Sequence, residues 1–174
     1  MRTSGVKVSR NTAIVGIVLI ALIIAVVVLG ILNYENITER RSLQESDMFL
    51  VTAGNYTHTV TRSDLLSMNP KAVSANYRDD IRNFTGIPIA KIPDFLNIDT
   101  TNASTVILTS LDGFTTILTI EEALDFDNAF IVFEEDGTGI GTREDGGFGP
   151  YMVVIVNDPF PNRWTKYLME ITIQ

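Results

Sequence analysis

One stretch of the sequence constrains the fold more than any other. Residues 13–32 read AIVGIVLIALIIAVVVLGIL and carry no charged side chain. Twenty residues in an α-helix span about 30 Å, which is the thickness of the hydrocarbon core of a membrane. A cleaved signal peptide is the alternative interpretation, but its apolar core is usually about 7–15 residues long and ends in an A-x-A-like site. The following residues, VVLGILNYEN, offer no such site. We therefore expect an uncleaved transmembrane helix over residues 13–33.

Charges on either side of this run predict its orientation. Three basic residues and no acid precede it, whereas two glutamates follow it ahead of the Arg40-Arg41 pair. The positive-inside rule then places residues 1–12 in the cytoplasm and the remainder outside the cell membrane. Residues 34–47 are polar and either extend the helix or form a short stalk. Residues 48–174 are long enough for one hydrophobic core and form the predicted extracytoplasmic domain.

Composition excludes several classes of site. The chain has no cysteine, so it has no disulfide, no thiolate metal ligand and no cysteine nucleophile. A single histidine, His58, rules out a site built on paired histidines. The net charge is −8, from 21 acidic and 13 basic residues, and no cluster of Lys and Arg exceeds the Arg40-Arg41 pair. Because phosphate backbones are bound by such clusters, we expect no nucleic-acid partner.

Four N-x-[ST] sequons occur, and they begin at Asn36, Asn55, Asn83 and Asn102. Sequons accept N-linked glycans on the surfaces of exported proteins, which agrees with the predicted orientation. Ordinary threonine-rich strands and turns produce the same pattern by chance. Both interpretations stay open at the level of sequence.

The rest of the chain predicts a sheet-dominated α+β domain with short helices. Two β-branched runs flank Asp112-Gly113 within residues 104–120, which is a hairpin signal. Short helices are expected after Ser63-Asp64 as an N-cap, within residues 85–98, and after Thr119, which is placed to cap Glu122. Further strands are expected in residues 49–52, 56–60, 128–137, 151–156 and 167–173.

The glycine-rich loop 134–147, EEDGTGIGTREDGG, permits several interpretations. A dinucleotide site needs G-x-G-x-x-G between a strand and a helix, and the third glycine here has the wrong spacing. A calcium loop needs alternating acids, and the alternation is missing, although a loose surface calcium site stays open. A flexible acidic hairpin loop, in which glycines permit positive φ, is the simplest interpretation. The adjacent acid pairs at 79–80 and 121–122 point apart and form no evident acid–base couple.

Four blocks of the sequence, in order, resemble those of one known family. They are FTGIPIAKIPDFLNI, LTSLDGFTTILTIEEAL, AFIVFEEDG and DGGFGPYMVVIVNDPFPNRWTKYLMEITI. Together they resemble the sulfite-oxidase-like molybdopterin-binding domain, over roughly residues 73–173. The resemblance implies a sheet-dominated sulfite-oxidase-like fold. It also implies a cofactor cleft whose residues in this chain would be Ser74, Asn76, Arg78, Arg163 and Trp164.

The chain departs from the family pattern where the family binds its cofactor. The family's molybdenum-ligating cysteine would fall near residues 74–76, where no cysteine exists. Asp145 stands where many members have histidine, Tyr151-Met152 where they have arginine, and only Arg163 keeps a basic residue before the tryptophan. An anionic cofactor would meet an acidic loop. We therefore expect no cofactor, with molybdopterin as the alternative.

The sequence thus predicts a membrane-anchored extracytoplasmic binding or assembly domain that is not catalytic. Its expected partners are the membrane and either a protein or a small anionic ligand, which Arg163 and Arg143 would meet. One alternative is a molybdopterin-dependent oxidoreductase that holds the cofactor through Asn76, Arg78 and Arg163, with Ser74 in place of the thiolate. Another is a subunit of a membrane redox complex that docks on a partner.

Overall fold

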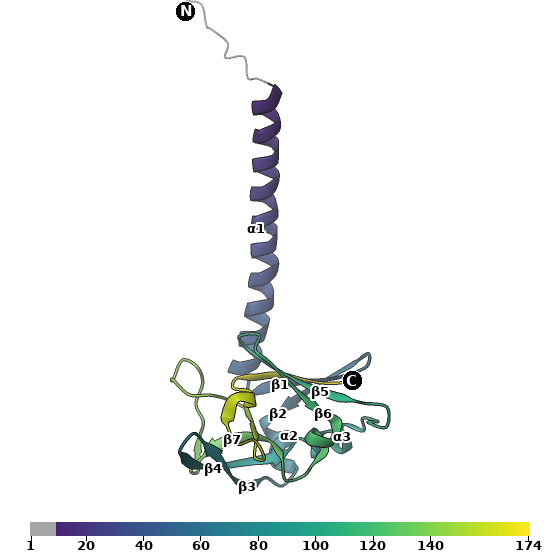
Figure 1. The fold of residues 1–174 in the computed structure, drawn as a ribbon, viewed down its shortest axis with the longest axis vertical. Helices are drawn as coiled ribbons and strands as arrows, with labels where there is room; N and C mark the ends of the chain where they lie inside the picture. The colour runs from purple at the N-terminus through teal and green to yellow at the C-terminus, as the bar shows by residue number, and fades with distance from the viewer. Residues whose placement is uncertain (1–9) are drawn as a thin grey trace, which may run out of the picture. The chain divides into compact units, whose positions relative to one another are not determined.

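The computed structural model describes the backbone of residues 10–174, and in helix α1 it describes the side chains of residues 14–31, 42 and 45. The first nine residues of the predicted cytoplasmic tail lie outside this range. The chain divides into two compact units, Met1–Glu39 and Arg40–Gln174. The first contains most of α1, and the second contains all the strands (Figure 1).

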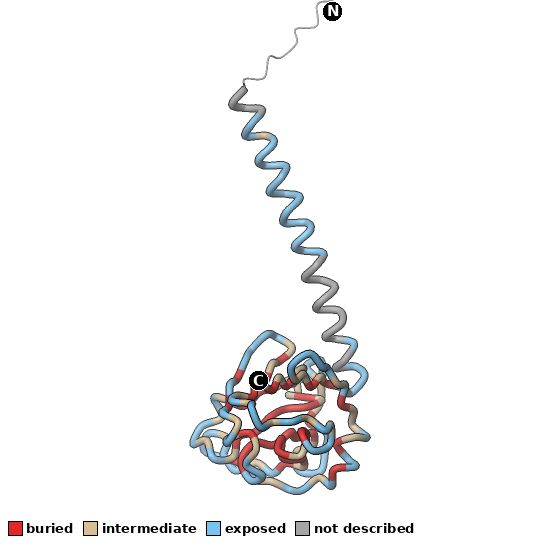
Figure 2. Tube along the Cα trace, turned by 90° about the vertical axis from the view of Figure 1, so that its right-hand side faces the viewer, coloured by how far each residue is buried: buried red, intermediate tan, exposed pale blue. Residues whose placement is uncertain are grey.

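Helix α1 extends over Arg10–Glu45. Its window Ile14–Ile31 has a mean hydropathy of 3.5 and is not buried against any other part of the described chain. Figure 2 shows this stretch as exposed throughout almost its whole length. By length and composition the helix can cross a membrane, and a signal sequence near the N-terminus would have the same properties. The helix also continues through most of the polar segment 34–47.

The first sheet, sheet A, has the strand order β2-β1-β10-β5-β6. Its strands are β1 (Met48–Ala53), β2 (Tyr56–Thr61), β5 (Thr105–Ser110), β6 (Thr115–Thr119) and β10 (Leu168–Ile173). The β5–β6 hairpin turns at Asp112-Gly113, as the sequence predicts, with Thr105 opposite Thr119. Strand β1 pairs antiparallel with β2 and parallel with β10, with Leu50 opposite Glu170. The first and last strands of the domain are therefore neighbours.

The second sheet, sheet B, is built around β7 (Ala129–Glu135). Strand β7 pairs with β4 (Asp80–Pro88), with β9 (Met152–Ile155) and with the two-residue strand β8 (Thr138–Gly139), while β3 (Lys71–Tyr77) pairs with β4 at the edge. Residues 129–133 and all of β9 are buried, so both faces of these strands are covered. Apolar runs without alternation are the sequence signature of such strands.

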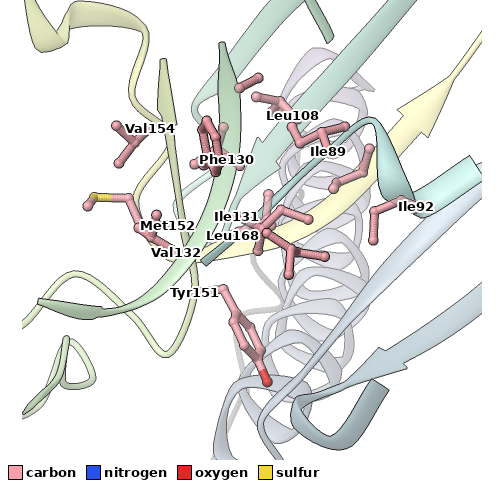
Figure 3. Packing of buried hydrophobic residues seen from close by; sticks show 14 of the residues in the cluster. Ile89, Ile92, Leu108, Phe130, Ile131, Val132, Tyr151, Met152, Val154 and Leu168 are labelled. Atoms are coloured by element: carbon pink, nitrogen blue, oxygen red, sulfur yellow. The ribbon is translucent and has the colours of Figure 1, made fainter. Parts of the chain in front are cut away.

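The apolar faces of both sheets meet in one core (Figure 3). Leu108 and Leu168 of sheet A, and Ile131 and Val132 of sheet B, are fully buried in it. Tyr151 is also fully buried, packs edge-on against the Phe49 ring at 5.2 Å, and donates its hydroxyl to the Asp47 carbonyl at 2.8 Å. Burial raises the pKa of the Tyr151 hydroxyl, so it stays a proton donor that secures the start of β1.

Short helices connect the strands: α2 (Arg62–Ser67), α3 (Lys91–Leu96), α4 (Ile120–Leu124) and the 3₁₀ turn η1 (Pro161–Arg163). The predicted cap of α4 is confirmed, since Thr119 and Glu122 form a capping box. The predicted cap of α2 is wrong. Its N-cap is Thr61, and Asp64 is the third helical residue of a capping box, because Thr61 is extended and its hydroxyl can accept from the Asp64 amide.

Gly86 marks a close approach of two strands in sheet B. The β4–β7 register shifts at Thr85/Gly86, and a Cβ placed on Gly86 would lie 2.3 Å from the Ile131 carbonyl oxygen. Only glycine leaves room for the backbones to meet at this bulge.

Candidate anion-binding pocket

The segment between β9 and β10 is fixed by a buried tryptophan. Trp164 is 4% exposed, and its ring lies 5.8 Å from that of Phe84 and 5.5 Å from that of Tyr77. Its indole Nε1 donates to a backbone carbonyl of β9 at 3.3 Å. The next residue, Thr165, exchanges two backbone hydrogen bonds with Val153, of 2.8 and 3.0 Å. This anchoring holds the residues on either side of Trp164 in fixed positions.

A pocket of about 510 Å³ lies beside this segment. The residues that line it come from the end of β3 and from the segment 160–166: Tyr77, Arg78, Phe160, Pro161, Asn162 and Lys166. Two of them are cations, one is an amide, and three are apolar or aromatic. The pocket is therefore suited to a ligand with a negative group and an apolar body.

Aromatic rings hold the cations around this pocket. The Lys166 ammonium lies 3.8 Å from the centre of the Phe148 ring, and the Arg82 guanidinium lies 4.1 Å from the centre of the Tyr77 ring. Arg78 lies over the same Tyr77 ring at 5.5 Å. Such cation–π contacts position a positive charge without neutralising it.

The cations differ in whether a carboxylate neutralises them. Arg82 pairs with Glu135 at 3.3 Å. Arg78 and Lys166 pair with no carboxylate of the described residues. Arg78 also stands at the turn of the β3–β4 hairpin, with φ of 59°. Two uncompensated positive charges therefore border the pocket of an otherwise acidic protein.

Arg163, only three residues from Lys166, is paired with two carboxylates. Its Nε donates to Asp158 Oδ2 at 2.8 Å, its Nη2 donates to Asp158 Oδ1, and Nη2 also donates to Glu122 Oε1 at 3.0 Å. The hydrogen bond from Arg163 lowers the pKa of Glu122, and the two carboxylates raise the pKa of Arg163 above its ordinary value. Its backbone carbonyl also accepts from Thr116 Oγ1 at 3.1 Å. This arginine has little capacity left for a ligand.

The structure does not bring the five predicted cleft residues together. Arg78 lines the pocket, and Trp164 supports it from behind Tyr77. Ser74 and Asn76 alternate with Ala75 and Tyr77 along β3, so they lie on the opposite, exposed face of the strand. The Ser74 hydroxyl donates to Asn83 Oδ1 at 2.8 Å on that face.

The chain's residues therefore do not fit molybdopterin in the arrangement that the resemblance implies. Ser74, in the place of the thiolate, is on the wrong face of β3 for a group held by Arg78. Arg163, in the place of a phosphate-binding base, is bound to Asp158 and Glu122. The absence of a cofactor stays a prediction.

The other sequence candidates are turn residues or surface residues. Asp145 Oδ2 accepts from the Thr142 amide and hydroxyl at 3.3 and 2.8 Å, which closes a turn within the glycine-rich loop. In the described part of the chain, no group of three His, Cys, Asp or Glu side chains is placed to hold a metal ion. Arg143, expected to meet an anion, lies 5.9 Å from the Tyr167 ring centre. It does not line the pocket.

Comparisons with known proteins give a fold and no family. The sequence matches no protein-family model and no curated protein sequence. Among solved structures, the chain is similar to the sulfane dehydrogenase SoxCD from Paracoccus pantotrophus, with a TM-score of 0.58 and 13% sequence identity. The match covers 72% of this chain and 37% of that chain. The likeness is one of fold, and it supports a sheet-dominated α+β domain of sulfite-oxidase-like type.

Most of the pocket cannot be predicted from the sequence. Tyr77, Phe148 and Lys166 come from distant parts of the chain and meet only through sheet B and the Trp164 segment. The available signal was the alternation Val73, Ala75, Tyr77, which marks an inward face of a strand.

Proposed function

We propose that this protein is a single-pass membrane protein whose extracytoplasmic domain binds a small organic anion and has no redox activity of its own. One observation carries the proposal: Arg78 and Lys166 border a pocket and are paired with no carboxylate among the described residues. Four other cations, Arg62, Lys71, Arg82 and Arg163, have acidic partners. Lys91 binds backbone carbonyls instead and Arg143 pairs with no carboxylate of the described residues, but neither lines the pocket.

Electrostatics supports an anion over other ligands. Two positive charges next to low-dielectric aromatic walls attract an anion more strongly than the same charges in open water. A bound carboxylate would supply the compensation that Arg82 receives from Glu135. Because these charges are only partly shielded from solvent, we expect the affinity to fall as salt is added.

The lining narrows the ligand class. A volume of about 510 Å³ lies within the range of small-molecule sites. Phe160 and Pro161 offer apolar contact, and Asn162 offers an amide that can donate and accept. A carboxylate carried on a flat apolar body matches these groups better than an inorganic ion, which would leave the apolar wall uncovered.

Calorimetry on the full chain in lipid nanodiscs tests the proposal. We use benzoate and inorganic phosphate as probes, and we expect saturable binding with benzoate tighter than phosphate. The Lys166→Gln and Arg78→Gln variants should each lose about tenfold in affinity, as for one lost charge-assisted contact. Lys71→Gln is the matched control, because Lys71 pairs with Asp127 and does not line the pocket. Absence of saturable binding by either probe, or an equal loss in the control, overturns the proposal.

The location is tested separately. We expect the protein to resist alkaline extraction from membranes, and an added protease to digest residues 48–174 from outside the cell while sparing the N-terminal tail. Release of a mature chain that lacks residues 1–32 would instead identify the apolar run as a cleaved signal peptide.

The likeness to a dehydrogenase favours a second candidate function, which has two versions. The protein would be either a molybdopterin-dependent oxidoreductase or a subunit of a membrane redox complex. Protein expressed in a host that makes the molybdenum cofactor would then contain near-stoichiometric molybdenum and pterin. A stoichiometric companion recovered with the full-length chain in mild detergent would support the subunit role. Folded protein without molybdenum, pterin or companion contradicts both versions.

A further inference from the structure

Two of the four sequons have their asparagines in tight turns at one rim of sheet A. Asn55 lies in the turn between β1 and β2, and Asn102 lies in the turn that precedes β5. Both residues are exposed. Neither side-chain amide makes a hydrogen bond to another described residue.

The Asn55 turn is a two-residue hairpin loop. Ala53 is paired with Tyr56, so Gly54 and Asn55 form the loop itself. Gly54 has φ of 58° and Asn55 has no positive φ, which is the type II′ pattern with glycine first. Asn55 is thus the third residue of the turn, and the sequon hydroxyl of Thr57 is exposed beside it. The Thr57 hydroxyl shares a hydrogen bond with the Thr52 hydroxyl at 3.2 Å, on the exposed surface.

The Asn102 turn has the same layout. The Ala103 amide donates to the Thr100 carbonyl at 3.0 Å, which places Asn102 third in a four-residue β-turn. Asp99 Oδ1 braces this turn by accepting from the amide and the hydroxyl of Thr101, at 2.9 and 2.6 Å. The sequon hydroxyl belongs to Ser104, which is exposed.

Strand register brings the two turns to the same rim. Ala53 of β1 is opposite Ile173 of β10, and Ile173 is opposite Val106 of β5. The turn after β1 and the turn before β5 are therefore separated by two strand spacings, about 10 Å. The pocket lies at the other end of β10, because Lys166 precedes Leu168 by two residues. The length of that strand, about 20 Å, separates the rim from the pocket.

Asn83 is a contrasting case within the same chain. It lies inside β4, its Oδ1 accepts from Ser74 at 2.8 Å, and its Nδ2 donates to Asp136 at 3.4 Å. The next residue of its sequon, Phe84, is 2% exposed. A glycan on Nδ2 would displace Asp136 and crowd the β3–β4 hairpin. The side chain of Asn36 lies outside the described residues.

We infer that Asn55 and Asn102 are N-glycosylation sites and that Asn83 is not. The inference rests on the extracytoplasmic location in the proposed function. In the transfer, a bond forms between the asparagine Nδ2 and the anomeric carbon of an oligosaccharide carried on a lipid phosphate. The bond from that carbon to the phosphate oxygen breaks, the lipid phosphate leaves with the electron pair, and the amide gives up one proton. Glycans at this rim leave the pocket open to its ligand.

Peptide mass spectrometry of the full chain from its native host tests the inference. Trypsin releases residues 42–62, with Asn55, and residues 83–91, with Asn83, while cleavage before aspartate isolates residues 99–111, with Asn102. We expect a glycan mass on the first and third peptides and none on the second. Unmodified Asn55 and Asn102, or a modified Asn83, would overturn the inference.

A hydroxyl swap provides the matched control. Thr57→Ala should abolish modification of Asn55, and Thr57→Ser should keep it, because only a hydroxyl at that position completes the sequon. Protease accessibility from outside the cell separates the two ideas. A domain accessible from outside with bare Asn55 and Asn102 refutes glycosylation alone, whereas an inaccessible domain refutes the proposed location as well.

Discussion

Arg163 and Lys166 are both cations of the same C-terminal segment, on either side of Trp164, yet their surroundings are opposite. Arg163 is held by two carboxylates, Asp158 and Glu122. Lys166 faces the ring of Phe148 and has no carboxylate partner in the described part of the chain. The first arrangement is closed, because donors and acceptors satisfy one another. The second arrangement leaves the positive charge of Lys166 available to a ligand.

The difference shows why residue type alone does not identify a ligand site. Arg163 is the more natural candidate from sequence, because it precedes the tryptophan in a family-like motif. Its neighbours make it a structural residue that joins α4 to the segment after β9. Lys166 gains its importance only from the aromatic rings that the fold places beside it.

Removing the residue between the two cations should have the largest effect. We expect Trp164→Ala to lower the free energy of unfolding by about 3–5 kcal/mol, because it empties a buried site against Phe84 and Tyr77. Urea denaturation measures the change. Trp164→Phe should lose less, since a ring remains. A loss below about 1 kcal/mol for Trp164→Ala would show that the segment is held chiefly by the backbone pairing of Thr165.

Exchanging the two cations for glutamine tests the contrast directly. Arg163→Gln should lower the free energy of unfolding by about 1–2 kcal/mol, because Asp158 loses its partner in a half-exposed setting, and should leave probe binding unchanged. Lys166→Gln should do the reverse, with weaker benzoate binding and little change in unfolding. Denaturation and calorimetry on both variants give the result. The same pattern for both would remove the distinction between closed and open sites.

Acid should weaken the ion pair between Arg163 and Glu122. The pKa of Glu122 is lowered in the folded protein by its hydrogen bond from Arg163, so the unfolded chain binds the proton more readily. The resulting stabilisation is complete above about pH 4.3 and is lost as the pH falls through the lowered, folded-state pKa.

We therefore expect the free energy of unfolding to fall more steeply below about pH 4.5 in the wild type than in Glu122→Gln. Glutamine keeps the capping box but does not titrate. Asp112 also has a lowered pKa, caused mainly by the Ser110 hydroxyl, and acts equally in both proteins. Denaturation between pH 2 and 6 measures the two slopes, and identical slopes would contradict the prediction.

The smallest effect is expected at the ring beneath the open cations. Tyr77→Leu should weaken benzoate binding by about twofold to fivefold, because Arg78 and Lys166 lose a cation–π contact of about 0.5–1 kcal/mol. Tyr77→Phe should bind as well as the wild type. Binding that falls equally in both variants would assign the role to the tyrosine hydroxyl in place of the ring.

Features that depend on a few neighbouring residues can be predicted from the sequence. The β5–β6 hairpin follows from β-branched runs around Asp112-Gly113, and the cap of α4 follows from Thr119 and Glu122, each within a few residues. The cap of α2 cannot be predicted in the same way, because Ser63-Asp64 and Thr61 are chemically equivalent candidates and backbone geometry decides between them. The apolar run predicts a helix able to cross a membrane, and α1 is such a helix.

Features that depend on residues far apart in the chain cannot be predicted from the sequence. The β3–β4 hairpin turns at Arg78-Asp79 without a glycine, and Arg78 adopts a positive φ that its sequence does not announce. Two of the five cleft residues inferred from family resemblance, Ser74 and Asn76, lie in β3, but alternation places them on the face opposite Tyr77. A shift of one residue along a strand moves each side chain to the other face of the sheet. The sequence blocks that resemble the family do not determine the alignment of β3 to within one residue.

The parallel pairing of β1 with β10 has a consequence for how the domain is made. A ribosome completes β1 and β2 first and β5 and β6 later, and these hairpins can join only when residues 168–173, the strand between them, have been synthesised. Until then the nascent chain holds two unpaired strand edges, of the kind that chaperones and aggregating chains recognise. A premature stop before Leu168 would therefore leave both hairpins unjoined, even though it removes only seven residues.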